Sequence, residues 1–395
     1  PKYFRKEHVN YHIEQSPDEL ALINYTSGTT GFSKGVMLPY RALWSNAYFA
    51  QSVLGSEVKS GDPIISILPM AHMYGMAFEF IFEFLTGCHI YFLTRIPSPA
   101  IIAQAFSEIK PRVIISVPLV IEKIIRKRVF PKLQNNAIRL LMHMPVIAKK
   151  LGDKICQQVS DAFGGQFYEV IIGGAAFNQE VEKFLHRIGF KYTVGYGATE
   201  CAPIICYADY HTYVPGSCGR PVVNMQVEID SPDPERIPGE ILAKGMNVML
   251  GYYKNEEATR QALDAEGWYH TGDLGTMDAQ GNVFIKGRSK NMLLGASGQN
   301  IYPEEIEDKL NSMELVSECI VIQEGDKLVG LVYPDYDEAQ SLGLSNSDIE
   351  KVMEQNRAEL NQSQPAYCRL SGIRLRSEEF EKTPKKSIKR FKYQR

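Results

Sequence analysis

The feature that most constrains the fold is an alternation of short apolar runs with longer amphipathic runs, from Leu20 to about Gly197. The strand candidates are LALINY, DPIISIL, HIYFLT, RVIISVP, YEVIIGG and KYTVGYG. Helix candidates between them include YRALWSNAYFAQSVL, PAIIAQAFSEI and NQEVEKFLHRIG. Such alternation is typical of a layered α/β domain with a largely parallel sheet. Ligands bind beyond the carboxyl ends of such strands, so YTSGTTG and VIIGGAAF are expected to line one crevice.

Two further patterns follow along the chain. From Gly216 to about Lys286, the runs NMQVEI, GEILAKG and NVFIKG are separated by turn residues and predict an antiparallel β unit. After Lys290, helical and strand-like runs alternate again and predict a small α+β domain of about a hundred residues. We therefore predict a large domain over 1–289 and a small C-terminal domain over 290–395.

The composition excludes several classes of protein. The 395 residues carry 43 Lys and Arg against 46 Asp and Glu, whereas dedicated nucleic-acid binders are usually strongly basic, so no nucleic-acid partner is expected. Seven cysteines form no CxxC pair, which argues against a zinc ribbon and a disulfide framework and favours a reducing cytoplasm. No secretory signal or initiator methionine opens the sequence, so we expect that it starts after the natural start.

The longest apolar stretch, around Met73 to Leu85, is too short to span a bilayer. It carries Glu79 and Glu83 one helical turn apart, which predicts a core-facing helix with these carboxylates on a wet side.

The stretch INYTSGTTGFSKGV packs Ser, Thr and Gly around one lysine. Backbone N–H groups, hydroxyls and an ammonium can converge on a phosphate in such a segment. A Walker loop requires glycine before its lysine and Ser or Thr after it, whereas Lys34 follows Ser33 and precedes Gly35. The spacing excludes a Walker loop; it favours another phosphate cradle over a plain glycine-rich turn from strand to helix.

Three later windows carry polar groups, and each has a simpler alternative. In VGYGATECAP, Glu200 could hold Mg²⁺, although a surface glutamate at a strand end is favoured when the window is taken singly. In GWYHTGDLG, Asp273 could bind a ribose diol, although an Asx-turn is the safer interpretation. In FIKGRSKNMLLGASGQNIYPEEIE, Lys290 falls at the predicted domain boundary and could be a hinge.

Taken together and in this order, YTSGTTGFSKG, GYGATE, YHTGDLG and GRSKNMLLGASGQNIYPEEIE resemble the core motifs of the adenylate-forming (AMP-binding) acyl-CoA synthetase superfamily. The resemblance runs from about Ser16 to the end of the chain. LPMAHMYGMAFE and KPRVIISVPLVIEKI make the chain most similar to bacterial long-chain fatty acid–CoA ligases. Full-length relatives carry a substantial N-terminal region before the phosphate loop, which is absent here.

The resemblance implies an enzyme that uses ATP and Mg²⁺ to convert a carboxylic acid, expected to be a fatty acid, to acyl-AMP. Pyrophosphate is released, and the acyl group then passes to the thiol of CoA. The residues implied to wrap the β- and γ-phosphates are Thr26, Ser27, Gly28, Thr29, Thr30, Gly31 and Lys34. Those implied to bind adenine are Gly173, Gly174, Ala175 and Ala176, with Tyr196 stacking on the base and Gly197 in the same nucleotide-binding set.

The remaining roles follow from the same resemblance. Thr199 would contact the α-phosphate, Glu200 would bind Mg²⁺, and Asp273 with Arg288 would hold the ribose. Lys290 matches the hinge position. His72 would lie by the acyl pocket, although a satisfied interior histidine is an equal alternative. Gly295, Ser297 and Gly298 belong to a loop that would reach the site during thiol transfer.

The sequence departs from the family pattern at two positions. Ser33 stands where relatives often have proline, which would loosen the loop. Ser387 occupies the usual position of the lysine that serves adenylation, so its neighbour Lys386 is the candidate for that role, with Lys385 beside it.

Other functions remain open. The enzyme could load an acyl carrier protein instead of CoA, or the chain could be a non-catalytic nucleotide-binding relative. The basic segments KTPKKSIKRFKYQR and EKIIRKRVFPK could contact RNA or a membrane, although a catalytic lysine and a solvated face explain their charge as well. We expect a cytoplasmic protein with at most peripheral contact at the inner face of the membrane.

Overall fold

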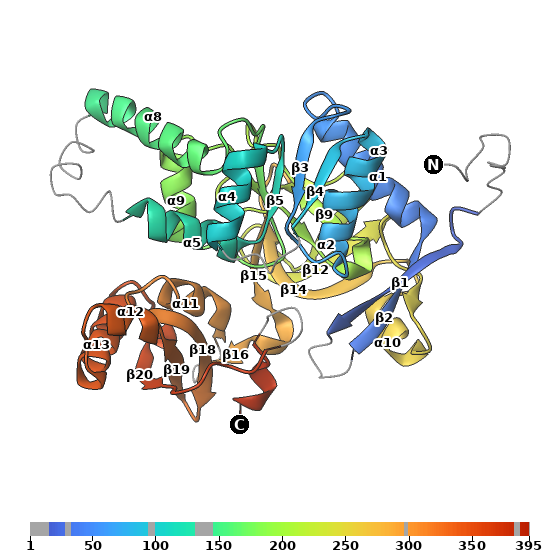
Figure 1. The fold of residues 1–395 in the computed structure, drawn as a ribbon. Helices are drawn as coiled ribbons and strands as arrows, with labels where there is room; N and C mark the ends of the chain where they lie inside the picture. The colour runs from blue at the N-terminus through green and yellow to red at the C-terminus, as the bar shows by residue number, and fades with distance from the viewer. Residues whose placement is uncertain are drawn as a thin grey trace.

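The parallel layer predicted for the first part of the chain is present in the computed structural model, shown as a ribbon in Figure 1. The structure describes residues 16–27, 33–93, 99–130, 145–295, 299–382 and 388–394. The parallel pairs are β3 (Pro63–Ser66) with β4 (His89–Phe92), and β5 (Ile114–Ser116) with β6 (Val170–Ile172) and β7 (Tyr192–Val194). The accompanying helices are α1 (Tyr40–Leu54), α4 (Pro99–Ile109), α5 (Pro118–Arg128), α8 (Pro145–Ala162) and α9 (Gln179–Arg187). The layered α/β prediction is therefore confirmed, and α1 and α4 span the predicted runs.

The first predicted strand does not belong to this parallel layer. β1 (Leu20–Ser27) pairs antiparallel with β2 (Ser33–Pro39), and β2 pairs antiparallel with β13 (Gly251–Tyr252). The glycine-rich segment therefore joins two strands rather than a strand and a helix. The prediction missed β2 because its glycine and terminal proline mask a short strand that buries Val36 and Leu38 completely.

The apolar stretch after His72 is divided into α2 (Met73–Met76), a π-helical turn η2 (Ala77–Ile81) and α3 (Phe82–Thr86). The predicted wet carboxylate side was wrong. Glu79 and Glu83 are both 0% exposed, whereas Phe84 and Leu85 are 69% exposed. A π-helical turn adds a residue to the local period and so changes which side chains face inward.

The Glu79 carboxylate has a specific reason to be buried. Its Oε2 accepts the backbone N–H groups of Ile67 at 3.1 Å and Leu68 at 2.8 Å, and the Ser66 hydroxyl at 3.2 Å. These donors lie where β3 ends, and buried donors without partners are costly. Glu79 therefore fixes the backbone that leads from β3 toward His72.

This burial predicts a pH-dependent contribution to stability. Burial raises the pKa of Glu79 to about 8 and that of Glu83 to about 7, against about 4.3 for an unperturbed glutamate. Between the unfolded and folded pKa values the folded chain binds more protons, so the free energy of unfolding falls as pH rises. We expect Glu79→Gln to remove up to ~1.4 kcal/mol per pH unit of this fall, including the part between pH 7 and 8.

Urea denaturation of both variants at several pH values measures the effect. Glu83→Gln is the matched control, since it should flatten the pH dependence mainly below pH 7. Identical slopes for wild type and Glu79→Gln between pH 7 and 8 would contradict the assignment.

The antiparallel β unit is confirmed. Its four strands, in sheet order, are β11 (Met225–Asp230), β12 (Gly239–Gly245), β14 (Tyr269–Met277) and β15 (Val283–Arg288). A second small antiparallel sheet contains β8 (Tyr196–Gly197), β9 (Ile204–Tyr207) and β10 (Arg220–Pro221). Helix α10 (Glu256–Ala262) packs beside β13.

The C-terminal elements have their own hydrophobic core, whose buried members run from Ile301 to Leu370. They are β16 (Leu293–Leu294), β17 (Asn300–Ile301), α11 (Pro303–Leu310), β18 (Val316–Glu324), β19 (Lys327–Pro334), α12 (Tyr336–Ser341), α13 (Asn346–Gln362) and β20 (Leu370–Leu375). The short turn η4 (Ser289–Asn291) precedes them and contains the predicted boundary at Lys290. In Figure 1 they form the orange and red part of the ribbon.

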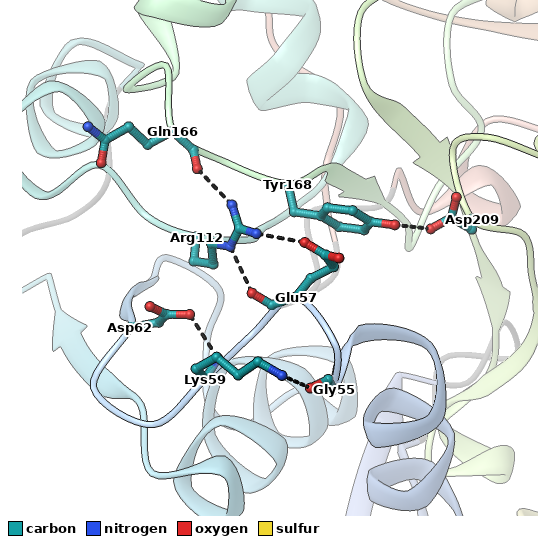
Figure 2. Close-up of polar contacts among 8 residues, drawn as sticks. All are labelled: Gly55, Glu57, Lys59, Asp62, Arg112, Gln166, Tyr168 and Asp209. Atoms are coloured by element: carbon teal, nitrogen blue, oxygen red, sulfur yellow. Dashed lines mark hydrogen bonds and ion pairs between the residues drawn. The ribbon is translucent and has the colours of Figure 1, made fainter.

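Polar contacts tie together the loops at the amino ends of the parallel strands (Figure 2). Arg112, just before β5, pairs with the Glu57 carboxylate at 2.7 Å and donates from Nε to the Glu57 carbonyl at 2.8 Å. Tyr168, just before β6, donates to Asp209 at 2.7 Å. Because ligands of parallel sheets bind at the opposite, carboxyl ends, we assign this cluster a structural role.

All seven cysteines lie in the described part of the chain and are free thiols. Within the described ranges, no helix combines the length and apolar character needed to cross a bilayer.

Candidate active site

Lys34 lies at the loop end of the β1–β2 hairpin, opposite Thr26 in the strand register. Its ammonium lies 4.1 Å from the centre of the Tyr252 ring. Burial lowers the pKa of Lys34, nearby Lys290 lowers it further, and the Glu200 carboxylate opposes both effects. The predicted phosphate lysine, metal carboxylate and hinge lysine therefore lie close to one another.

Several residues that the sequence predicts to bind phosphate lie wholly or partly outside the residues that the structure describes. Ser27 ends β1, and only its backbone is described. Gly28, Thr29, Thr30 and Gly31 lie outside the described residues.

Glu200 lies in a short 3-10 turn, η3 (Thr199–Cys201), next to the predicted α-phosphate residue Thr199. The Tyr252 hydroxyl donates to Glu200 Oε1 at 2.9 Å. Asn46 of α1 holds the following loop, because its Nδ2 donates to the Cys201 carbonyl at 3.2 Å. The strand-end carboxylate is therefore held in place rather than projecting freely from the surface.

Asp273 and Arg288 are directly opposite each other on β14 and β15. Arg288 Nε lies 2.7 Å from Asp273 Oδ1, and the Tyr196 hydroxyl donates to Asp273 Oδ2 at 2.6 Å. The Asp273 side chain is 7% exposed, whereas that of Arg288 is 52% exposed. The Asx-turn alternative is wrong, since Asp273 lies within a strand and accepts from two residues distant in sequence.

The pKa of Asp273 is shifted by the same surroundings. Burial raises it, while the Arg288 guanidinium and the Tyr196 hydroxyl oppose the rise. Burial and the adjacent Asp273 raise the pKa of the Tyr196 phenol well above its usual range, so this hydroxyl stays a donor. A carboxylate flanked by a phenol and a guanidinium is a suitable partner for a diol.

Gly173 and Gly174 follow β6 where the parallel strand ends. Gly174 has φ +87°, and a Cβ at Gly173 would lie 3.1 Å from the Tyr74 ring. The two glycines, with Tyr196 and Gly197, line an apolar cavity of about 70 Å³ that continues between α1 and the α2–α3 segment. Ala175 and Ala176 come next in the chain and are exposed rather than in the cavity lining.

His72 immediately precedes α2 and is half-buried. It is not in the cavity lining, to which Tyr74, two residues later, contributes. The segment is tied to the hairpin, because Asn24 Nδ2 of β1 donates to the Ala71 carbonyl at 3.0 Å. A role for His72 by an acyl pocket stays a prediction.

The predicted thiol-transfer loop lies at the tip of the β16–β17 hairpin, where the Gly295 N–H donates to the Gln299 carbonyl at 2.8 Å. Ser297 and Gly298 lie outside the described residues, as does the candidate lysine Lys386 with its neighbours Lys385 and Ser387.

Sequence reasoning missed Tyr252, Asn46 and Tyr74. Tyr252 contacts both Lys34 and Glu200, Asn46 braces the Glu200 loop, and Tyr74 lies against Gly173. No motif singled them out, because each partner is distant in sequence and the contact depends on the completed fold.

The donor set fits a magnesium–nucleotide complex. Mg²⁺ prefers one or two carboxylates together with phosphate oxygens, and Glu200 offers one carboxylate near the Lys34 ammonium. The described residues contain no group of three or more His, Cys, Asp or Glu side chains that could hold an ion.

Comparisons with known proteins identify the fold. Residues 3–253 match the model of the AMP-binding enzyme family, and residues 290–395 match that of the AMP-binding enzyme C-terminal domain. The chain is 29% identical over 343 residues to long-chain-fatty-acid–CoA ligase 1 of Saccharomyces cerevisiae, with 81% of this chain and 49% of the relative covered. It is 28% identical over 390 residues to a chloroplastic long-chain-fatty-acid–[acyl-carrier-protein] ligase of Arabidopsis thaliana, with 82% and 52% covered. The chain thus spans about half the length of these relatives.

Among solved structures, O-succinylbenzoate coenzyme A synthetase from Bacillus subtilis, in complex with ATP and magnesium ion, is similar with a TM-score of 0.72 and 20% identity. The similarity covers 95% of this chain and 70% of that one, and it shows a shared fold. Since the family model matches residues 3–253, well over half of the sequence, this chain belongs to the AMP-binding enzyme family.

Proposed function

We propose that the protein activates a fatty acid with ATP to give acyl-AMP and pyrophosphate, and then transfers the acyl group to the thiol of CoA. The observation that carries this proposal is the meeting of Tyr196, Asp273 and Arg288 beside the Glu200 carboxylate. A ribose-binding pair and a phosphate-side carboxylate close together suit a bound nucleotide. The cavity that begins at Gly173 and Tyr196 has an apolar lining, and this character favours an acyl chain over a polar acid as the neighbouring substrate group.

The chemistry explains why these groups are needed. A carboxylate is a poor acyl donor because its leaving group would be oxide, and a mixed anhydride with AMP removes this obstacle. The carboxylate attacks the α-phosphorus in line and pyrophosphate departs, so catalysis consists mainly of positioning and charge neutralisation.

Each group has a proposed part in this step. Lys34 attracts the departing pyrophosphate, Asp273 and Arg288 hold the ribose, and Thr199 contacts the α-phosphate. Mg²⁺, when bound at Glu200, neutralises phosphate charge. Lys386, in the C-terminal segment, stays the proposed lysine for adenylation.

The same proposal divides the chain at Lys290 into a large domain and a small domain that rotates between the two half-reactions. Its support is the position of Lys290 in η4, between β15 and the first strand of the C-terminal elements. In this view the small domain first supplies the adenylation lysine and then the β16–β17 hairpin for thiol transfer.

Substituting the hinge tests the division. Proline fixes φ and disfavours the helical conformation of the preceding Ser289, so Lys290→Pro is expected to slow thioester formation more than adenylation. Lys290→Ala, which removes the charge but leaves the backbone free, is the control. Single-turnover rates of both half-reactions measure the split, and an equal loss in both would remove the hinge argument.

The decisive experiment for the function is carboxylate-dependent pyrophosphate exchange by the complete protein, across short, medium, long-chain and aryl acids. It is repeated with CoA and with an acyl carrier protein as acceptor. Exchange that requires a fatty acid, followed by acyl-CoA formation, supports the proposal. If none of the tested acids supports exchange, the proposal is refuted and a non-catalytic nucleotide-binding protein is favoured.

Transfer to a carrier protein is the second candidate, since one relative is named as a ligase of that kind. We propose a cytoplasmic location on the basis of the seven free cysteines.

A further inference from the structure

One side chain, Tyr252, contacts both of the charged groups assigned to the phosphate end of the nucleotide. Its hydroxyl donates to Glu200 Oε1 at 2.9 Å, and its ring faces the Lys34 ammonium at 4.1 Å from the centre. Tyr252 is 4% exposed, so both contacts are made away from bulk water.

The backbone around Tyr252 is fixed from two sides. Tyr252 pairs with Val36 of β2, the strand that carries Lys34. On the other side its N–H donates to Thr259 Oγ1 of α10 at 2.9 Å. Gly251, just before it, has φ +137°, and a Cβ there would lie 2.7 Å from Thr259 Cγ2. The ring is therefore held in place by the fold rather than by the two charges.

The two charges have a competing arrangement. A carboxylate and an ammonium in direct contact near a protein surface attract each other strongly. In a direct ion pair between Lys34 and Glu200, the ammonium proposed to bind phosphate and the carboxylate proposed to bind Mg²⁺ would neutralise each other. Among the residues that the structure describes, both charges meet Tyr252 instead of each other.

The two contacts also support each other. A phenol that donates its proton toward a carboxylate gains negative charge on the ring, which strengthens attraction to a cation over the ring face.

We propose that Tyr252 is a positioning residue that holds Lys34 and Glu200 apart, and so keeps a phosphate-binding cation and a magnesium-binding carboxylate available side by side. This inference rests on the proposed function, because it gives the two residues their phosphate and metal roles. Glu200 contacts the Tyr252 hydroxyl and Lys34 contacts the Tyr252 ring, so substitutions can separate the effect on the carboxylate from the effect on the ammonium.

Three variants separate the contacts. Tyr252→Phe removes the hydroxyl and keeps the ring, and Tyr252→Leu removes both. Tyr253→Phe is the matched control, because this neighbour is 44% exposed and its ring faces Lys254 instead. ATP binding to the complete protein is measured by calorimetry, first without Mg²⁺ and then over a range of Mg²⁺ concentrations.

For Tyr252→Phe we expect an ATP affinity without Mg²⁺ within about twofold of wild type, and a Mg²⁺ requirement about 10- to 150-fold higher, the effect of one lost hydrogen bond to a charged group. For Tyr252→Leu we expect the same higher Mg²⁺ requirement, together with ATP binding without Mg²⁺ that is weaker by about 3- to 10-fold. Tyr253→Phe should match wild type in both measurements.

The outcomes distinguish failure of the role proposed for Tyr252 from failure of the proposed function. If wild type binds ATP with Mg²⁺ and Tyr252→Phe has an unchanged Mg²⁺ requirement, the inference is refuted and the proposed function stands. If wild type binds no ATP at any Mg²⁺ concentration, the proposed function itself fails. Should Tyr252→Leu not fold, Tyr252→Phe still decides the question, because it lacks only one oxygen atom.

Discussion

A Glu200→Gln enzyme is expected to lose carboxylate-dependent pyrophosphate exchange by about 100- to 1,000-fold, the usual cost of removing one charge-stabilising group. Glutamine keeps the size of the side chain and an oxygen that can accept the Tyr252 hydroxyl. The substitution therefore removes the negative charge while the local contacts remain, and the melting temperature should change little.

Exchange is measured at saturating fatty acid over a range of Mg²⁺ concentrations, because a weakened metal site raises the Mg²⁺ requirement. Glu257→Gln on α10 is the control, since this glutamate is exposed and lies outside the candidate site. A Glu200→Gln rate within a factor of a few of wild type would exclude the metal role.

The second large effect is expected from Arg288→Met. Asp273 would keep the Tyr196 hydrogen bond but lose its counter-charge, and an uncompensated buried charge costs about 3–5 kcal/mol. We expect a loss near the lower end, about 3 kcal/mol, because Arg288 is half-exposed and Tyr196 still donates. Nucleotide binding should fall in parallel.

The pH dependence identifies the cause of this loss. Without Arg288 the folded pKa of Asp273, already raised by burial, rises further. The folded variant then binds more protons than the unfolded chain over a wider pH range, so its stability falls more steeply as pH rises.

Urea denaturation at pH 5 and pH 8 tests this, with Arg260→Met as the control. Arg260 is 75% exposed in an ion pair with Glu256, and such surface pairs contribute about 0–1 kcal/mol. Equal losses for the two variants, or a loss independent of pH, would contradict the role assigned to Arg288.

The sequence predicted elements whose signal is local. The helix over Tyr40–Leu54 and the antiparallel strands after Gly216 follow from residue period and turn residues, and both are present. The strand over Ser33–Pro39 was missed because its pattern is short and interrupted by glycine. The sequence predicted that Glu79 is exposed to solvent, because a carboxylate in an apolar helical pattern is normally assigned to the exposed side. The pattern carries no information on the N–H groups at the end of β3 that Glu79 accepts.

The site shows the same limit. Lys34, Glu200, Asp273 and Arg288 were selected from separate windows, and the structure brings them close together. That Tyr196 reaches Asp273 depends on how two separate sheets are arranged, and that Tyr252 reaches both Lys34 and Glu200 depends on the pairing of β13 with β2 and on the position of η3. A contact between residues far apart in one sequence leaves no local pattern to read.

The position of Arg288 has a mechanical consequence. It is the last residue of β15, and the turn containing Lys290 begins at the next residue. In the proposed rotation about Lys290, each atom moves in proportion to its distance from the axis, so the end of β15 proposed to bind the ribose stays almost still while the far side of the small domain moves a long way. Under the same proposal, an adenylate bound there keeps its ribose contact during the rotation. The intermediate then need not be released and recaptured between the two proposed half-reactions.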